Sequence, residues 1–85
     1  ALVAFPGGFG TLDELFEVMT LVQTRKSRQV PILLFGSDYW HRLINMDLLV
    51  EEGMISAEDL NLFRYVDTPE AAWQAICEFY QLKVL

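Results

Sequence analysis

Continuous apolar runs and helical repeats alternate along this chain. Residues 1–5 and 30–35 are nearly unbroken apolar runs, a pattern typical of strands that are buried on both faces of a sheet. The run at 62–66 alternates more and is rich in strand-forming residues, so we expect it nearer a sheet edge. The pattern therefore predicts three strands.

A helical repeat follows each of the first two predicted strands. Between about Leu12 and Thr24, apolar residues recur every three or four positions, which predicts a helix with one buried face. Asp38 is the expected N-cap of a second helix, and Gly53 is expected just beyond its end. The side chains predicted to face inward from this second helix are Trp40, Leu43, Ile44 and Leu48.

Two further helical segments complete the pattern. Ser56 begins a short turn that we expect to end near Asn61. Thr68 and Pro69 are a strong helix start, with threonine as N-cap and proline in the first helical position. The predicted buried face of this last helix comprises Ala72, Trp73, Ile76, Cys77 and Tyr80.

Strands that alternate with helices predict an α/β fold with a parallel sheet, because parallel strands need crossover connections. We expect three strands and three main helices. In sheets of this kind, ligands bind beyond the carboxyl ends of the strands, where each loop leads into a helix. The first such loop, at residues 6–11, is therefore the candidate site.

The loop Pro6-Gly7-Gly8-Phe9-Gly10-Thr11 is rich in glycine. It leads from a strand into a helix, where unpaired backbone N–H groups and the positive end of the helix dipole suit a phosphate. We expect the glycines to allow positive φ angles and close approach of the backbone to the anion. Thr11-Leu12-Asp13-Glu14 is also a capping box, although a capping box explains neither Pro6 nor three glycines.

Two standard Gly-rich loops do not fit this segment. A dinucleotide-binding fingerprint needs a further glycine three residues after Gly10, and Asp13 stands there. A P-loop needs a lysine directly after a glycine, and no lysine in this chain follows one. The predicted phosphate site is therefore of another kind.

Composition narrows the class of protein. The chain has 85 residues, of which 53% are hydrophobic and 21% charged, which is typical of a globular chain with at most one domain. Its net charge of -6 argues against a nucleic-acid partner. No apolar stretch approaches the roughly 20 residues of a membrane span, and no basic segment precedes the first run. We therefore expect a cytoplasmic protein without membrane contact.

Few residues offer metal or covalent chemistry. Cys77 is the single cysteine, so it is expected to pack as a small hydrophobe. His41 lacks partners for a metal site and is expected on a helix surface. A pyridoxal enzyme needs a lysine that forms a Schiff base, and Lys26 in a polar turn and Lys83 near the end of the sequence are poorly placed for that role.

The segment from Pro6 to Glu14 resembles the P-G-G-x-G-T-x-x-E signature of the LONELY GUY family. This family comprises cytokinin riboside 5'-monophosphate phosphoribohydrolases, which were long described as lysine decarboxylases. The resemblance extends to the segments 36–40 and 52–56 and to the closing Thr68-Pro69-Glu70. It therefore covers nearly the whole chain.

The resemblance implies a Rossmann-like fold, a homodimer and no cofactor. It implies hydrolysis of the N-glycosidic bond of AMP or its N6-substituted relatives, which yields the free base and ribose 5-phosphate. Carried over to this chain, Glu14 is the catalytic carboxylate and Asp13 contacts the sugar. The residues implied to bind the phosphate of the nucleotide are Gly7, Gly8, Phe9, Gly10 and Thr11.

The resemblance also implies an arginine from a segment upstream of the Gly-rich loop, which this sequence lacks. We therefore expect residues 1–85 to be the C-terminal half of a single nucleotide-binding domain and to be inactive in isolation. A carrier or sensor that binds a phosphorylated ligand without cleaving it is the alternative. A half-domain kept only for dimer contacts is a weaker alternative.

Overall fold

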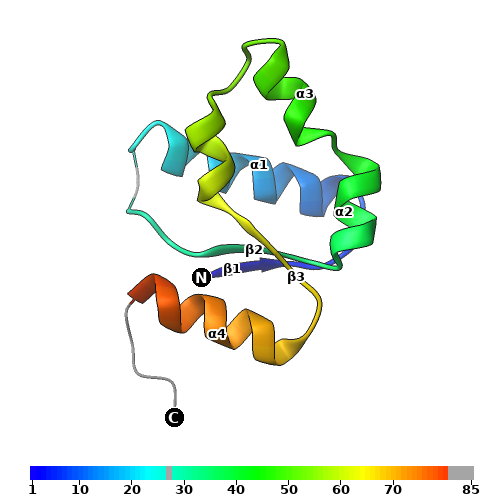
Figure 1. The fold of residues 1–85 in the computed structure, drawn as a ribbon, viewed down its shortest axis with the longest axis vertical. Helices are drawn as coiled ribbons and strands as arrows, with labels where there is room; N and C mark the ends of the chain where they lie inside the picture. The colour runs from blue at the N-terminus through cyan, green and yellow to red at the C-terminus, as the bar shows by residue number, and fades with distance from the viewer. Residues whose placement is uncertain (27, 81–85) are drawn as a thin grey trace.

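The computed structural model describes residues 1–26 and 28–80, and its centre is a three-stranded parallel sheet (Figure 1). The strands are β1 (Leu2–Ala4), β2 (Ile32–Phe35) and β3 (Arg64–Val66), in the order β1-β2-β3. Leu2 pairs with Ile32 and Leu33 pairs with Arg64. The predicted α/β fold with a parallel sheet is confirmed, and β3 lies at an edge of the sheet as expected.

Helices cover both faces of the sheet. Four helical elements, α1 (Phe9–Gln23), α2 (Ser37–Leu43), α3 (Met46–Glu51) and the 3-10 helix η1 (Ala57–Leu62), lie on one side, and α4 (Pro69–Tyr80) lies on the other (Figure 1). Successive side chains of a strand point to opposite faces. Ile32 and Leu34 therefore pack in the core under α1 and α2, whereas Leu33 packs with Ala75 of α4. No helix of the described residues is long and apolar enough to cross a membrane.

The predicted second helix is in fact two short helices, α2 and α3. Ile44 is extended, with φ -128° and ψ 124°, and the Asn45 side chain accepts a hydrogen bond from Leu48 N at 3.1 Å, which starts a new helix. Trp40 is buried as predicted. The change of direction between α2 and α3 leaves Leu43 and Leu48 half exposed, so the prediction that they face inward was wrong.

The last helix starts as predicted, and Ala72, Ile76 and Cys77 of its predicted buried face pack inward. The Thr68 hydroxyl accepts a hydrogen bond from Ala71 N at 3.0 Å, which confirms the N-cap. Cys77 is fully buried, as expected. Trp73 is 57% exposed and Tyr80 is 47% exposed, so their predicted burial was wrong. The contact with the sheet is made by the small side chains of Ala71, Ala72 and Ala75, together with Ile76.

α1 and α3 end in the same way. Lys26 N donates to Leu21 O beyond α1, and Met54 N donates to Leu49 O beyond α3. These bonds, with the shorter ones from the preceding residues, make Schellman motifs, which need a residue at positive φ. That residue is Gly53 after α3, with φ 74°, but Arg25 after α1, with φ 60°.

Candidate functional site

The loops that leave the three strands are joined to one another at the carboxyl edge of the sheet. Gly36 N, after β2, donates to Val66 O of β3 at 2.8 Å. Ser37 donates to the Asp67 carboxylate from its backbone N–H at 2.9 Å and from its hydroxyl at 2.8 Å. The loop after β1 contacts the same region, since a Cβ built on Gly36 would lie 3.5 Å from Pro6 Cγ. The candidate loop therefore packs against the loop after β2, which is itself hydrogen-bonded to the end of β3.

Asp67 caps α2 from a distant part of the chain. The predicted N-cap, Asp38, instead lies in the first turn, and Gly36 takes the N-cap position with φ 95°. Two hydrogen bonds from Ser37, first from its backbone N–H and then from its hydroxyl, lower the pKa of Asp67 from its ordinary value of 3.8, and the nearby His41 lowers it further. The carboxylate of Asp67 therefore holds the loops after β2 and β3 together.

α1 begins three residues earlier than predicted, at Phe9, with Gly8 as its N-cap. Thr11 is therefore inside the first turn, and the capping box of Thr11 and Glu14, the alternative interpretation of this segment, does not form. The first turn closes with the hydrogen bond from Leu12 N to Gly8 O at 3.1 Å. The N–H groups of Phe9, Gly10 and Thr11 precede it and point out of the helix end. The Gly-rich loop thus presents backbone donors to the space in front of α1.

The three glycines of the loop differ in how much space surrounds them. A Cβ on Gly7 would lie 2.9 Å from Thr11 Cβ and closer still to the Thr11 hydroxyl, so the fold itself needs glycine there. A Cβ on Gly8 or Gly10 would have no described atom within 4 Å. The positive φ angles that we expected in this loop are absent, and the glycines that adopt them are Gly36 and Gly53. Only Gly7 is required by contacts of the described chain.

Thr11 and Glu14 line one groove of about 270 Å³ between β1 and α1. The two residues are three positions apart, so their side chains leave the helix on the same side, one turn apart. Asp13 lies on a different side of α1, along with Phe16 and Glu17. Phe9 is 91% exposed at the helix start. The structure therefore brings Thr11 and Glu14 together and places Asp13 and the Phe9 side chain apart from their groove.

Tyr39 is a residue of this region that sequence reasoning missed. Its hydroxyl donates to Gly7 O at 2.7 Å, and its ring packs edge-on against Trp40 with 5.2 Å between centroids. The Trp40 indole in turn donates to Phe35 O at 3.0 Å. Tyr39 belongs to the segment 36–40 that extended the resemblance, but no local pattern predicts a contact across 32 positions.

Comparison with known proteins identifies the family. A family model described as "Possible lysine decarboxylase" matches residues 1–76. A "Probable cytokinin riboside 5'-monophosphate phosphoribohydrolase" from Oryza sativa subsp. japonica is 37% identical over 68 residues, which are 79% of this chain and 30% of that protein. Another from the same organism is 32% identical over 80 residues, which are 93% of this chain and 33% of that protein. The chain belongs to the LONELY GUY family.

Other relatives of the LONELY GUY family are similar over a shorter stretch. A cytokinin riboside 5'-monophosphate phosphoribohydrolase from Arabidopsis thaliana is 44% identical over 57 residues, which are 66% of this chain and 26% of that protein. The chain thus spans about a third or less of the length of these relatives. The predicted signature Pro6 to Glu14 lies within the part that the family model matches.

The name of the family model refers to lysine decarboxylation. The described part of this LONELY GUY chain places no lysine near the Gly-rich loop, where a Schiff base with a cofactor would need one. Lys26 is exposed just beyond the end of α1, about 22 Å along the helix from the Gly-rich loop. Lys83 lies outside the described residues. No group of three metal-ligating side chains occurs within residues 1–26 and 28–80.

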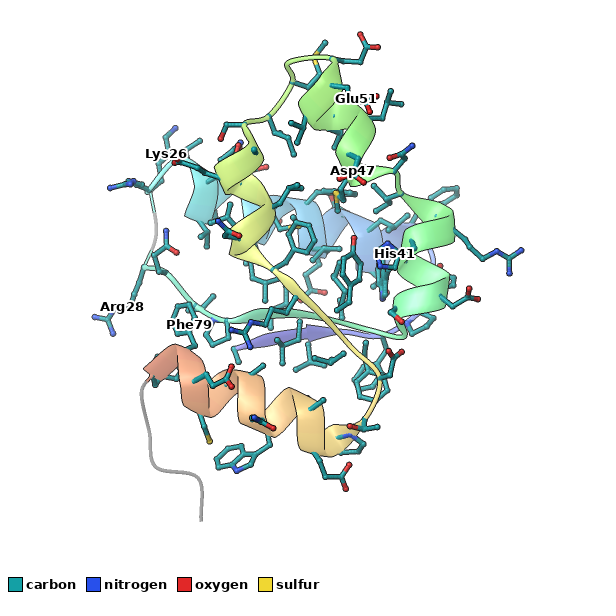
Figure 2. All side chains as sticks on the ribbon, in the orientation of Figure 1. Lys26, Arg28, His41, Asp47, Glu51 and Phe79 are labelled. Atoms are coloured by element: carbon teal, nitrogen blue, oxygen red, sulfur yellow. The ribbon has the colours of Figure 1, made fainter. Side chains whose placement is uncertain are left out.

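A second cluster of polar side chains lies away from the Gly-rich loop. The His41 ring stacks on Tyr65 with 3.9 Å between centroids. Both line a cavity of about 450 Å³ that is also lined by Asn45 and Asp47, and Figure 2 shows His41 on α2 and Asp47 on α3. Partial burial and, secondarily, the charge of Asp47 raise the pKa of Tyr65. His41 lies on an exposed helix surface, as predicted.

Proposed function

We propose that this chain forms the phosphate-binding loop and the catalytic carboxylate of a nucleoside 5'-monophosphate phosphoribohydrolase. The reaction is hydrolysis of the N-glycosidic bond of AMP or an N6-substituted relative to the free base and ribose 5-phosphate. The observation that carries the proposal is the open start of α1, where Gly8 and Gly10 leave free space in front of backbone donors. The three relatives described above are named as cytokinin riboside 5'-monophosphate phosphoribohydrolases, which supports the same reaction.

The phosphate is proposed to bind at the start of α1. Each hydrogen bond to a charged group contributes about 1.5 to 3 kcal/mol, whereas the helix dipole contributes about 0.3 to 2 kcal/mol. The converging N–H groups therefore supply most of the binding energy. Gly8 and Gly10 let the anion approach the backbone, and the Thr11 hydroxyl adds a donor from the groove side.

Glu14 is proposed to act at the ribose. It lines the groove one helical turn from Thr11, so an anchored 5'-phosphate places the sugar along its carboxylate. A carboxylate stabilises the oxocarbenium-like state in which the bond from C1' to the base breaks. The base nitrogen leaves with the electron pair of the broken bond, and water bonds to C1'. Glu14 accepts one proton from that water and passes it to the base nitrogen, which restores the carboxylate. Asp13 lies on another side of α1 and does not line this groove. For the proposed contact with the sugar, the substrate would have to extend beyond the groove to the Asp13 side of α1.

The proposal is tested by the Glu14→Gln variant of the full-length protein. This change keeps the size of the side chain and removes its charge, so we expect kcat for release of ribose 5-phosphate from AMP to fall by at least about a hundredfold. KM should change little, because the phosphate anchor is intact. Glu17→Gln is the matched control, since Glu17 is on the same helix but does not line the groove.

Two outcomes would contradict the proposal. Full activity of Glu14→Gln would remove Glu14 from the mechanism. Saturable binding of AMP and of N6-prenylated AMP by the wild-type protein, without release of ribose 5-phosphate, would replace the hydrolase by a carrier or sensor.

The proposal includes the homodimer that the family resemblance implies. Large apolar side chains are exposed at several places, among them Phe9 in α1, Met54 in the turn after α3 and Trp73 in α4. Such side chains are available for contact with a second copy.

A further inference from the structure

The hydroxyl of Tyr39 holds one peptide group of the Gly-rich loop. It donates to Gly7 O at 2.7 Å and is partly buried. Figure 1 shows α2, which carries Tyr39, starting beside the segment that joins β1 to α1. The base of α2 is fixed by the two hydrogen bonds between Ser37 and Asp67. Tyr39 therefore connects the candidate phosphate loop to a helix whose start is hydrogen-bonded to the loop after β3.

Fixing the Gly7 carbonyl also fixes the N–H of Gly8. The two groups belong to one planar peptide, and the described chain has no cis peptide bond, so they point in opposite directions. Because Gly7 O faces Tyr39, the Gly8 N–H faces away from α2. Gly8 is exposed there, and no described atom would contact a Cβ built on it.

A peptide between two glycines can turn over at low cost. Rotation of the Gly7–Gly8 peptide by half a turn would take φ of Gly8 from -96° to roughly +84°, a region that glycine adopts as readily as negative φ. The turned peptide would present a carbonyl oxygen to the anion and repel it. Other residues avoid such an angle, but here both flanking positions are glycine.

We propose that Tyr39 is a positioning residue of the phosphate site, whose hydroxyl keeps the Gly7–Gly8 peptide turned with its N–H toward the bound phosphate. This inference rests on the proposed function. Without the hydroxyl, the loop samples the turned peptide, and a ligand must first select the competent form. Once the ligand is bound, the loop is in the same form in both proteins, so the loss falls on binding and leaves the chemical step unchanged.

The test is Tyr39→Phe in the full-length protein, with AMP as substrate. We expect KM to rise about five- to tenfold, as for loss of one hydrogen bond, and kcat to stay within about twofold. Tyr65→Phe is the matched control, because it removes a tyrosine hydroxyl from a residue that lines a separate cavity. Its KM should equal that of the wild type.

A double-mutant cycle separates peptide rotation from a general loosening of α2. Gly8→Ala disfavours the turned peptide by itself, because alanine resists φ near +84°. Tyr39→Phe should therefore raise KM by no more than about twofold when alanine already replaces Gly8. The ratio of KM values within each background is compared, so any direct effect of the new methyl on the ligand cancels.

The possible results lead to distinct conclusions. An unchanged KM in Tyr39→Phe, with an active wild type, overturns the inference and leaves the proposed function intact. An equal rise of KM in the wild-type and Gly8→Ala backgrounds, or a fall of kcat at constant KM, also overturns it. A wild-type protein that binds neither AMP nor ribose 5-phosphate, and that does not cleave AMP, overturns the proposed function and the inference with it.

Discussion

Gly10 lies in the first turn of α1, where glycine weakens a helix and the backbone does not require it. We predict that Gly10→Ala raises the free energy of unfolding of the full-length protein by about 0.5–1 kcal/mol. The same change should raise KM for AMP severalfold, because its methyl group enters the space proposed for the phosphate. Denaturant unfolding and steady-state kinetics on one preparation measure both effects.

Thr20→Ala is the control for this prediction. Thr20 is exposed in the middle of α1, and its hydroxyl bonds back to Phe16 O at 2.7 Å. Its replacement should also favour the helix but leave KM unchanged, since it is more than two turns from Gly10. A stabilised Gly10→Ala protein with wild-type KM would mean that the phosphate does not use this space.

At the scale of single residues, the sequence predicted the candidate phosphate loop but not the side chains that hold that loop and its neighbours in place. The string from Pro6 to Glu14 led to an anion site, and the structure places Thr11 and Glu14 in one groove. The local environments of Tyr39 and Asp67 could not be predicted. Their partners, Gly7 and Ser37, are 32 and 30 positions away, and no periodicity records such contacts.

The two Schellman motifs at the ends of α1 and α3 provide a matched pair of residues at positive φ. Arg25 has φ 60° and Gly53 has φ 74°. We predict that Arg25→Gly stabilises the full-length protein by about 0.5 kcal/mol, because relief of the strained φ exceeds the added freedom of the unfolded chain. Gly53→Ala should destabilise it by about 1 kcal/mol. Chemical denaturation of both variants measures the two signs.

The prediction is that the free energy of unfolding rises in Arg25→Gly and falls in Gly53→Ala. Nothing described lies within 4 Å of a Cβ on Gly53, so its loss reflects backbone conformation alone. A destabilised Arg25→Gly protein would show that the arginine side chain contributes more than its conformation costs.

At the scale of elements, the order was predictable and several boundaries were not. Apolar runs and helical repeats predicted each strand and the existence of α1 and α4. The start of α1 was misplaced because Thr11 matches a capping box, whereas the N-cap is Gly8, which has no side chain. The break between α2 and α3 was missed because the apolar pattern continues through Ile44, although Asn45 begins a new helix.

The joined loops at the carboxyl edge predict how the whole protein responds to acid. The folded-state pKa of Asp67 is lowered below 3.8 by its bonds to Ser37. Its contribution to stability is therefore complete well above pH 3.8 and is lost as pH falls through the lowered value. We predict that Asp67→Asn destabilises the protein at pH 7 and that the difference from the wild type shrinks below about pH 4. Thermal unfolding across pH measures this.

Asp38→Asn is the control for the acid response. Asp38 is exposed and lies 3.8 Å from Arg42, and such surface pairs contribute little to stability. A difference between Asp67→Asn and the wild type that stays constant from about pH 7 to about pH 3 would exclude charge as the reason for the Ser37 contact.

The architecture of the whole molecule followed from the alternation of strands and helices, but only part of the buried face of α4 did. Trp73 and Tyr80 continue the apolar repeat, yet the sheet is contacted by the alanines beside them. Periodicity identifies an apolar stripe but cannot determine which part of it packs closest. Close approach favours the smallest side chains, and the large ones are then left at the margin.

The close contact between Gly7 and Thr11 links the substitutions that these two positions tolerate. An alanine in place of Gly7 would collide with both Cβ and the hydroxyl of Thr11 unless the backbone shifts, and a glycine in place of Thr11 would remove the collision. Replacing Gly7 without moving the start of α1 therefore costs the hydroxyl beside the groove. Selection for the Thr11 hydroxyl therefore also favours glycine at position 7, and we expect related proteins to retain or lose these two residues together.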